Sequence, residues 1–221
     1  NQIVAMRKLN FVFILFILFV SIMPTSCNKG PIQYDFDGVI YNSLTDIPVQ
    51  GVDVSISQKI ILNGTTGVGY TLAGSAVTDA SGAWAITFDR EKVTEFIIEI
   101  EKDNYFPIEK IESSANISTE DLNSYSDIIE PMSWVTFKIK NSFPNEDDHF
   151  KLVTQTFRED CQGCAENKTT DFYGSVDTVF TYATTAGEYV KFTYINVTIA
   201  DSDLDSVYTT PFENIEYSIT Y

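Results

Sequence analysis

Histidine is nearly absent from this sequence of 221 residues, which holds one, together with three cysteines and 14 basic against 31 acidic residues. A zinc hydrolase needs two or three histidines and a glutamate, so that class is excluded. The formal net charge of −17 repels nucleic acid and anionic headgroups, which excludes binding through a basic patch. We interpret His149 as a surface residue without partners. Nucleophile elbows and phosphate-binding glycine loops are absent from the sequence, and we expect no cofactor and no enzymatic activity.

Long hydrophobic runs are also absent, except for the segment from Phe11 to Met23. A membrane-spanning helix needs roughly 20 apolar residues, so this shorter run is typical of a signal peptide. Met6-Arg-Lys8 precedes it and Ser26-Cys27 follows it, and the whole pattern resembles a bacterial lipoprotein signal, which is cut before a lipidated cysteine. The resemblance implies a signal peptide at residues 1–26, of which 1–5 are an upstream extension, with Cys27 as the lipid acceptor.

A lipidated Cys27 implies a protein of the cell envelope, anchored to the outer membrane through the lipid. Residues 27–33 would form the tether. The sequence leaves open whether the protein faces the periplasm or the outside. Two triplets, Asp177-Thr-Val179 and Asp205-Ser-Val207, resemble the O-glycosylation sequon that Bacteroidetes use for exported proteins.

Short strands are the expected secondary structure, because proline, glycine, asparagine and aspartate interrupt the chain at short intervals. Between the interruptions, apolar and polar residues alternate: Val52, Val54 and Ile56 share one face, as a half-buried strand requires. Thr184-Thr-Ala-Gly187 lies between two such segments and predicts a hairpin.

The strand pattern predicts an all-β chain of two β-sandwich domains in tandem. The first is expected at residues 34–112 and the second at 131–221. Residues 113–130 are polar and acidic, and we expect them to form a connector.

Three segments of the first predicted domain form a recognisable combination: Phe36-Asp-Gly-Val39, Ile47-Pro-Val-Gln-Gly-Val-Asp-Val54 and Thr78-Asp-Ala-Ser-Gly-Ala-Trp84. Together they resemble the carboxypeptidase regulatory-like family. The resemblance implies a transthyretin-like sandwich of seven strands over residues 34–112, and we recognise no family for the second half.

Cys161 and Cys164 are separated by two residues. In an oxidising compartment such a pair forms a loop disulfide, which is the interpretation that we favour. A metal site would need two more ligands, and the sequence has neither a second Cys-x-x-Cys pair nor two histidines. A redox-active pair would need a lowered thiol pKa, which the acidic neighbours oppose. Two free, inert thiols are the remaining alternative.

Asp201, Asp203 and Asp205 alternate along one segment and could face one calcium ion. The EF-hand pattern requires a glycine at position six and a glutamate at position twelve, where this chain has Ser206 and Phe212. We therefore favour a solvated acidic turn, with weak calcium binding as the alternative, and we expect no other metal site.

Trp134 lies with Thr136 and Lys138 on the face of a predicted strand opposite to Val135 and Phe137. If that face is open to solvent, the indole is the kind of side chain that stacks on a sugar or on a partner protein. The alternative is that Trp134 packs at the seam between the two domains, because it lies close to the predicted connector.

These observations favour a non-enzymatic lipoprotein that presents a binding or assembly surface at the cell envelope. A carbohydrate-binding accessory of an outer-membrane glycan-uptake system is the alternative, in which Trp134 would contact the glycan. A hydrolase is the third class, because the transthyretin fold also includes a hydroxyisourate hydrolase. That enzyme relies on several histidines, an arginine and a Tyr-Arg-Gly-Ser C-terminus, whereas this sequence ends in Ser218-Ile-Thr-Tyr221.

Overall fold

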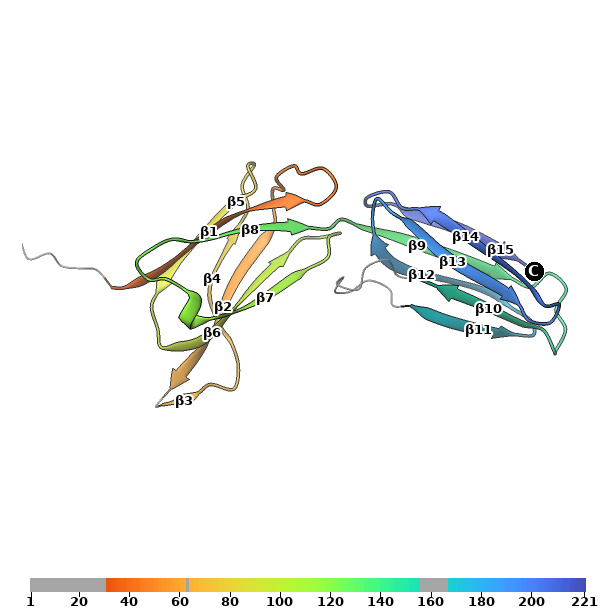
Figure 1. Ribbon diagram of the computed structural model, residues 1–221, viewed down its shortest axis with the longest axis horizontal. Helices are drawn as coiled ribbons and strands as arrows, with labels where there is room; N and C mark the ends of the chain where they lie inside the picture. The colour runs from red at the N-terminus through yellow and green to blue at the C-terminus, as the bar shows by residue number, and fades with distance from the viewer. Residues whose placement is uncertain (1–30, 63, 156–166) are drawn as a thin grey trace, which may run out of the picture. The chain divides into compact units, whose positions relative to one another are not determined.

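The computed structural model describes residues 31–62, 64–155 and 167–221, and these residues form an all-β structure (Figure 1). Apart from one 3₁₀ turn at Ser114–Asn116, the regular elements in these ranges are all β-strands. The predicted all-β class is therefore confirmed. Within the same ranges, no helix has the length and hydropathy that crossing a membrane requires.

The strands from Gln33 to Ile129 form a first β-sandwich. One sheet has the order β5-β1-β8, in which β1 is antiparallel to β5 and parallel to β8. The other has the antiparallel order β4-β2-β6-β7, and the two-residue strand β3 pairs with the end of β2. The strands are β1 (Gln33–Asn42), β2 (Asp53–Leu62), β3 (Thr65–Thr66), β4 (Thr71–Val77), β5 (Ala83–Asp89), β6 (Val93–Glu101), β7 (Ile108–Ser113) and β8 (Asn123–Ile129).

Alternating side chains build the core of this sandwich. Every second residue of β5 is buried, because successive side chains of a strand point to opposite faces. Four aromatic side chains fill the space between the two sheets, and the centroids of each pair of their rings lie 5.2–6.4 Å apart. Stacked, tilted and edge-on aromatic contacts of this length stabilise a core beyond the burial of their area. The four are Tyr34, Phe36, Phe88 and Phe96.

An ion pair joins the last strands of the two sheets in this first sandwich. Lys110 on β7 pairs with Asp127 on β8, and the lysine also lies over the ring of Tyr125, with Nζ 5.9 Å from its centroid. Asp127 is 5% exposed, so the lysine is its compensating charge at this edge. Removing one partner of such a pair leaves a buried charge uncompensated, which makes this contact a specific link between the sheets.

Residues 113–130 do not form the connector that the sequence predicts. Asn123–Ile129 is strand β8, and its residues pair in parallel with Phe36–Asn42 of β1. Its polar composition is misleading because β8 is an edge strand, on which polar outer positions are normal. Asp127 and Ile129 point inward and are buried. The first sandwich therefore extends to Ile129 and does not end at residue 112.

The strands from Met132 to Thr220 form a second β-sandwich, as predicted. Its sheets have the orders β12-β9-β15 and β11-β10-β13-β14. Residues 33–221 form one compact unit, in which most of the buried hydrophobic side chains fall into two clusters with no shared member. The strands are β9 (Met132–Lys140), β10 (His149–Thr154), β11 (Lys168–Tyr173), β12 (Asp177–Thr185), β13 (Tyr189–Asn196), β14 (Asp201–Tyr208) and β15 (Asn214–Thr220).

The two sandwiches have the same topology, which the sequence does not reveal. In each, the first strand is the centre of the three-stranded sheet, with one antiparallel neighbour and with the last strand parallel to it. The four-stranded sheets β4-β2-β6-β7 and β11-β10-β13-β14 correspond strand by strand and are antiparallel throughout. The described chain is therefore a repeat of one seven-strand arrangement, to which the short β3 is added.

Thr184–Gly187 is not the hairpin turn that its composition predicts. β12 pairs with β9, whereas β13 pairs with β10 and β14, so this segment carries the chain from one sheet to the other. Gly187 has φ +82°, a conformation that glycine adopts without strain, and its amide donates to the carbonyl of Thr209 at 2.8 Å. The chain does turn at this segment, but turn residues alone do not distinguish a hairpin from a connection between two sheets.

Candidate functional site

Trp134 lies on the outer face of β9, the central strand of the sheet β12-β9-β15. Its neighbours across the two ladders are Ala183 on β12 and Asn214 on β15. The indole is half-buried, and no ring pair formed among the described residues includes it. The predicted placement of Trp134 opposite the inward-facing Val135 and Phe137 is confirmed.

A row of polar side chains lies beside the indole on the same face. The Oγ1 atom of Thr136 is 2.6 Å from Oγ1 of Thr181 and donates to Oδ1 of Asn214 at 2.9 Å. One row further along, Nζ of Lys138 contacts Oε2 of Glu216 at 2.6 Å. The face therefore combines one aromatic ring with hydroxyl, amide, ammonium and carboxylate groups.

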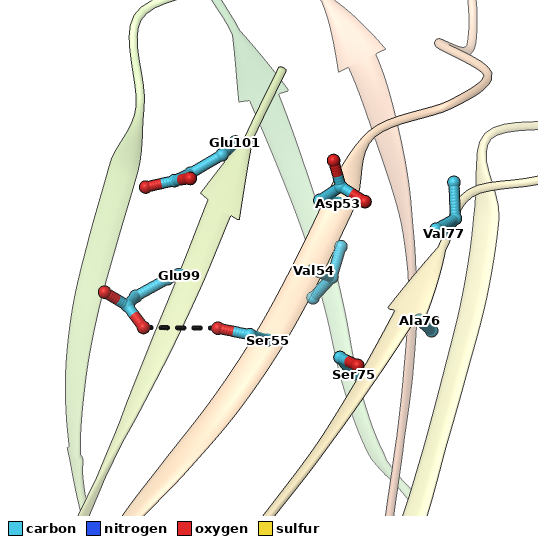
Figure 2. A pocket seen from close by; sticks show the side chains of 8 residues that line it. All are labelled: Asp53, Val54, Ser55, Ser75, Ala76, Val77, Glu99 and Glu101. Carbon is cyan, nitrogen blue, oxygen red and sulfur yellow. Dashed lines mark hydrogen bonds between the residues drawn. The ribbon is translucent and has the colours of Figure 1, made fainter. Parts of the chain in front are cut away.

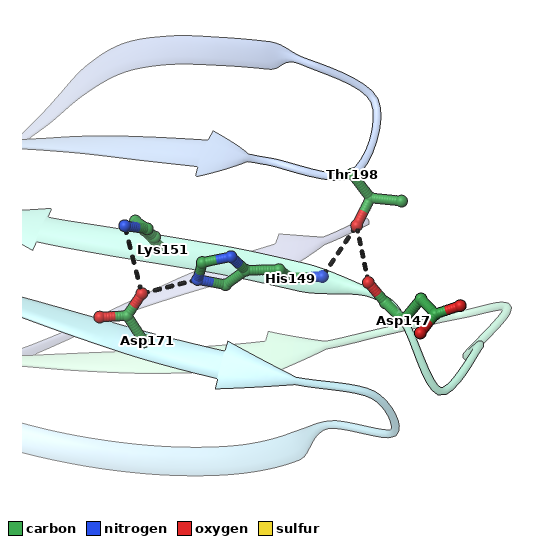
Figure 3. Close-up of polar contacts among 5 residues, drawn as sticks. All are labelled: Asp147, His149, Lys151, Asp171 and Thr198. Carbon is green, nitrogen blue, oxygen red and sulfur yellow. Dashed lines mark hydrogen bonds and ion pairs between the residues drawn. The ribbon is translucent and has the colours of Figure 1, made fainter.

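His149 lies at the start of β10 on the outer face of the other sheet (Figure 3). Its Nε2 is 2.6 Å from Oδ1 of Asp171, and its ring stacks on Tyr173 with the centroids 4.4 Å apart. Nζ of Lys151 lies 3.5 Å from the same Asp171 oxygen, so two basic side chains share one carboxylate. The hydrogen bond with His149 holds the pKa of Asp171 below its ordinary value.

The interpretation of His149 as a residue without partners is therefore wrong, although it does lie at the surface. Asp171 is 22 residues further along the chain, and the β10–β11 register brings the two together. The spacing of the two residues carries no signal for this pairing, because a strand register is fixed by the whole sheet. No hydroxyl or thiol of the described residues hydrogen-bonds to the imidazole ring, so the arrangement here is an ion-pair cluster and lacks a bound nucleophile.

Replacing Asp171 by asparagine is expected to lower the melting temperature at neutral pH, because the variant loses the charge shared by His149 and Lys151. The folded-state pKa of Asp171 is lowered, so its contribution is present above the unfolded value of about 3.9 and is lost as the pH falls through the folded value. Melting curves of the wild type and of Asp171→Asn, followed by circular dichroism, should therefore differ at neutral pH and converge as the pH falls below about 4.

The control for this prediction is Asp147→Asn. The carboxylate of Asp147 forms no ion pair with the described residues, although its backbone carbonyl accepts from Thr198 (Figure 3). We expect the difference in melting temperature between Asp147→Asn and the wild type to stay the same as the pH falls. An Asp171→Asn difference that stays constant across the pH range would contradict the role of the charge.

A depression of about 530 Å³ on the first sandwich gathers three carboxylates (Figure 2). Asp53 on β2 lies directly opposite Glu101 on β6, and Glu99 accepts a hydrogen bond from Oγ of Ser55 at 3.2 Å. Like charges at opposite positions destabilise a sheet. None of the ion pairs among the described residues involves these three acids. Sequence reasoning missed this cluster, because the β2–β6 register creates it.

Asp201, Asp203 and Asp205 do not lie in the acidic turn that we favoured from the sequence. They occupy alternate positions of strand β14. Tyr194 donates a hydrogen bond to Asp203 at 3.1 Å, and Tyr217 donates one to Asp205, which lowers the pKa of the Asp205 carboxyl. In the part of the chain that the structure describes, no group of three or more acidic, histidine or cysteine side chains has the geometry of a metal site.

The remaining predicted site residues fall outside the described ranges. These are the lipid acceptor Cys27 with its signal segment, and the cysteine pair Cys161 and Cys164. The disulfide and the lipidation therefore stay predictions.

In comparisons with known proteins, no protein-family model and no curated protein matches this sequence. Among solved structures, the chain is similar to the Bacillus anthracis TIE protein (TM-score 0.37, 8% identity, covering 86% of this chain and 34% of that one). It is also similar to a streptococcal ancillary pilin, with TM-score 0.35 and 8% identity over 86% of this chain and 62% of that one. A third similar structure is the shaft pilin SpaA from Lactobacillus rhamnosus GG, with TM-score 0.32 and 10% identity over 86% of this chain and 98% of that one.

Proposed function

We propose that this chain is a non-enzymatic binding or assembly module, held at the outer membrane by a lipid on Cys27. The observation that carries the proposal is the order of features at the N-terminus. A basic start, a short apolar run and Ser26-Cys27 are followed almost at once by strand β1 at Gln33. Such a short tether would hold the first sandwich close to the bilayer surface, and net charge −17 would keep the chain from adhering to anionic headgroups.

The chemistry of the described side chains supports a binding role. The single histidine is engaged by Asp171 and Tyr173. In the depression on the first sandwich, Glu99 accepts a hydrogen bond from Ser55, and near Trp134 the side chains of Thr136, Thr181 and Asn214 hydrogen-bond to one another. Among the described residues, the lining of this depression contains no basic side chain that could stabilise a developing negative charge, as a hydrolytic site requires.

We also propose that residues 34–129 form a domain of the carboxypeptidase regulatory-like family. The seven strands longer than two residues in the first sandwich, arranged in two sheets, support this assignment. Gly38, Gly51 and Gly82 of the three matching segments lie at a close backbone approach or at a positive φ, where glycine is required.

Labelling of growing cells with radioactive palmitate tests the anchor. We expect the wild-type chain to incorporate label and to sediment with the envelope, and we expect Cys27→Ala to lose the label and to leave the envelope fraction. Cys161→Ala is the matched control and should keep the label, because that cysteine lies far from the signal segment. Label that persists in Cys27→Ala, or that never appears in the wild type, would rule out the lipid anchor.

A glycan-binding accessory is the second candidate. The observation that favours it is the position of Trp134, half-buried on an outer sheet face with polar side chains beside it. Tryptophan is enriched at binding interfaces, because its ring is apolar and its N–H group can donate a hydrogen bond.

A further inference from the structure

We propose that the outer face of the sheet β12-β9-β15 binds a neutral sugar ring, with Trp134 as the stacking platform. This inference rests on the second proposed function, a glycan-binding accessory. It adds that the glycan is neutral, and it names the residues that would bind it beside Trp134.

The platform is the indole of Trp134. Because Ala183 lies opposite it on β12, one side of the ring is bordered by a small side chain, which leaves room for a ligand. Among the described residues, the indole nitrogen of Trp134 has no hydrogen-bond acceptor, and it is not one of the buried polar atoms, so a ligand can reach it. The ring can therefore offer an apolar face for the C–H groups of a pyranose and an N–H donor for a hydroxyl.

The hydroxyl-binding groups are Asn214, directly opposite Trp134 on β15, and the pair of Thr136 and Thr181 in the neighbouring row. Thr136 is 4% exposed, and its hydrogen bonds to Thr181 and Asn214 hold both exposed side chains in place. The amide oxygen of Asn214 is thereby occupied, and its NH₂ group keeps donors for a ligand. Directly opposite residues on paired strands are about 5 Å apart, and residues two apart on one strand are about 7 Å apart, so both Asn214 and the threonine pair lie within reach of a ring stacked on Trp134.

The charge of this face selects a neutral ligand. Lys138 is paired with Glu216 at 2.6 Å, and Lys140 lies 3.9 Å from Asp177. The face is therefore balanced in charge within a protein of net charge −17. An anionic glycan would meet no free cation here and would be repelled by the whole chain, whereas a neutral hexose would meet only dipoles and paired charges.

Affinity gel electrophoresis of the purified full-length protein tests this site. The probes are three neutral polymers, namely a β-glucan, an α-glucan and a mannan, with polygalacturonate as the anionic comparison. We expect at least one neutral polymer to retard the wild type and polygalacturonate to have no effect. Trp134→Ala should weaken the retardation about tenfold or more, as truncation of a central aromatic contact does.

Tyr189→Ala is the matched control, because this ring is 58% exposed on the other sheet of the same sandwich, and it should bind as the wild type does. If Trp134→Ala fails to fold, Trp134→Phe and Asn214→Ala test the site instead. Both variants should be retarded less than the wild type by the same neutral polymer. No retardation by any neutral polymer, or equal retardation of the wild type and the Trp134 and Asn214 variants, would overturn the site. Neither result affects the palmitate experiment, so failure of the sugar site is distinguishable from failure of the lipid anchor.

Discussion

Replacing Phe137 by alanine is expected to lower the free energy of unfolding by about 3–5 kcal/mol, the usual cost of removing a buried phenylalanine. Phe137 is fully buried on β9, and its ring lies 4.9 Å from that of Phe192 and 5.7–6.1 Å from three other rings. The loss is large against a typical net stability of about 5–15 kcal/mol. Urea unfolding followed by tryptophan fluorescence measures it, because Trp134 lies on the same strand.

Leu204→Ala provides the matched control, since it also removes a large apolar side chain from the second sandwich. Leu204 is 61% exposed on β14, so its truncation leaves no cavity. We expect a change within about 0.5 kcal/mol. A Phe137→Ala variant no less stable than Leu204→Ala would show that the aromatic cluster does not form the core of the second sandwich.

Replacing Gly38 by alanine is expected to lower the free energy of unfolding by about 3 kcal/mol, because the added methyl group overpacks a filled core. A Cβ atom at this position would lie 2.0 Å from the backbone oxygen of Tyr125 and 2.7 Å from Nε1 of Trp84. The first contact is with the neighbouring strand itself, so relief requires β8 to move away from β1. Thermal melting measures the loss, and hydrogen exchange at β8 should increase in the variant.

Gly69→Ala is the control for the glycine substitution. A Cβ atom there would meet no atom within 4 Å, so we expect a change within about 0.5 kcal/mol. Equal stability of Gly38→Ala and Gly69→Ala would mean that β1 and β8 are not as closely paired as the structure has them.

Local alternation made the strands predictable. The spacing of Val52, Val54 and Ile56 placed β2 and its buried face, and the same reasoning placed Trp134 on the outer face of β9. Both results depend only on the two-residue period of a strand, which is a property of neighbouring residues.

Pairing between strands was not predictable in the same way. The polar edge strand β8 has no apolar face long enough to be distinguished from a loop. The contact between His149 and Asp171 and the opposition of Asp53 and Glu101 both depend on register. Register is decided by the packing of whole sheets, so a single sequence carries little local signal for it. The common topology of the two sandwiches is hidden for the same reason.

The parallel pairing of the first and last strands in each sandwich has a mechanical consequence. A pull that enters at the start of β1 and leaves at the end of β8 acts along both strands in opposite directions, so it loads their evenly spaced hydrogen bonds in shear. β9 and β15 repeat this geometry in the second sandwich. Bonds loaded in shear share the force and must break together. A chain tethered at its N-terminus and held at its far end would therefore resist extension at two shear clamps.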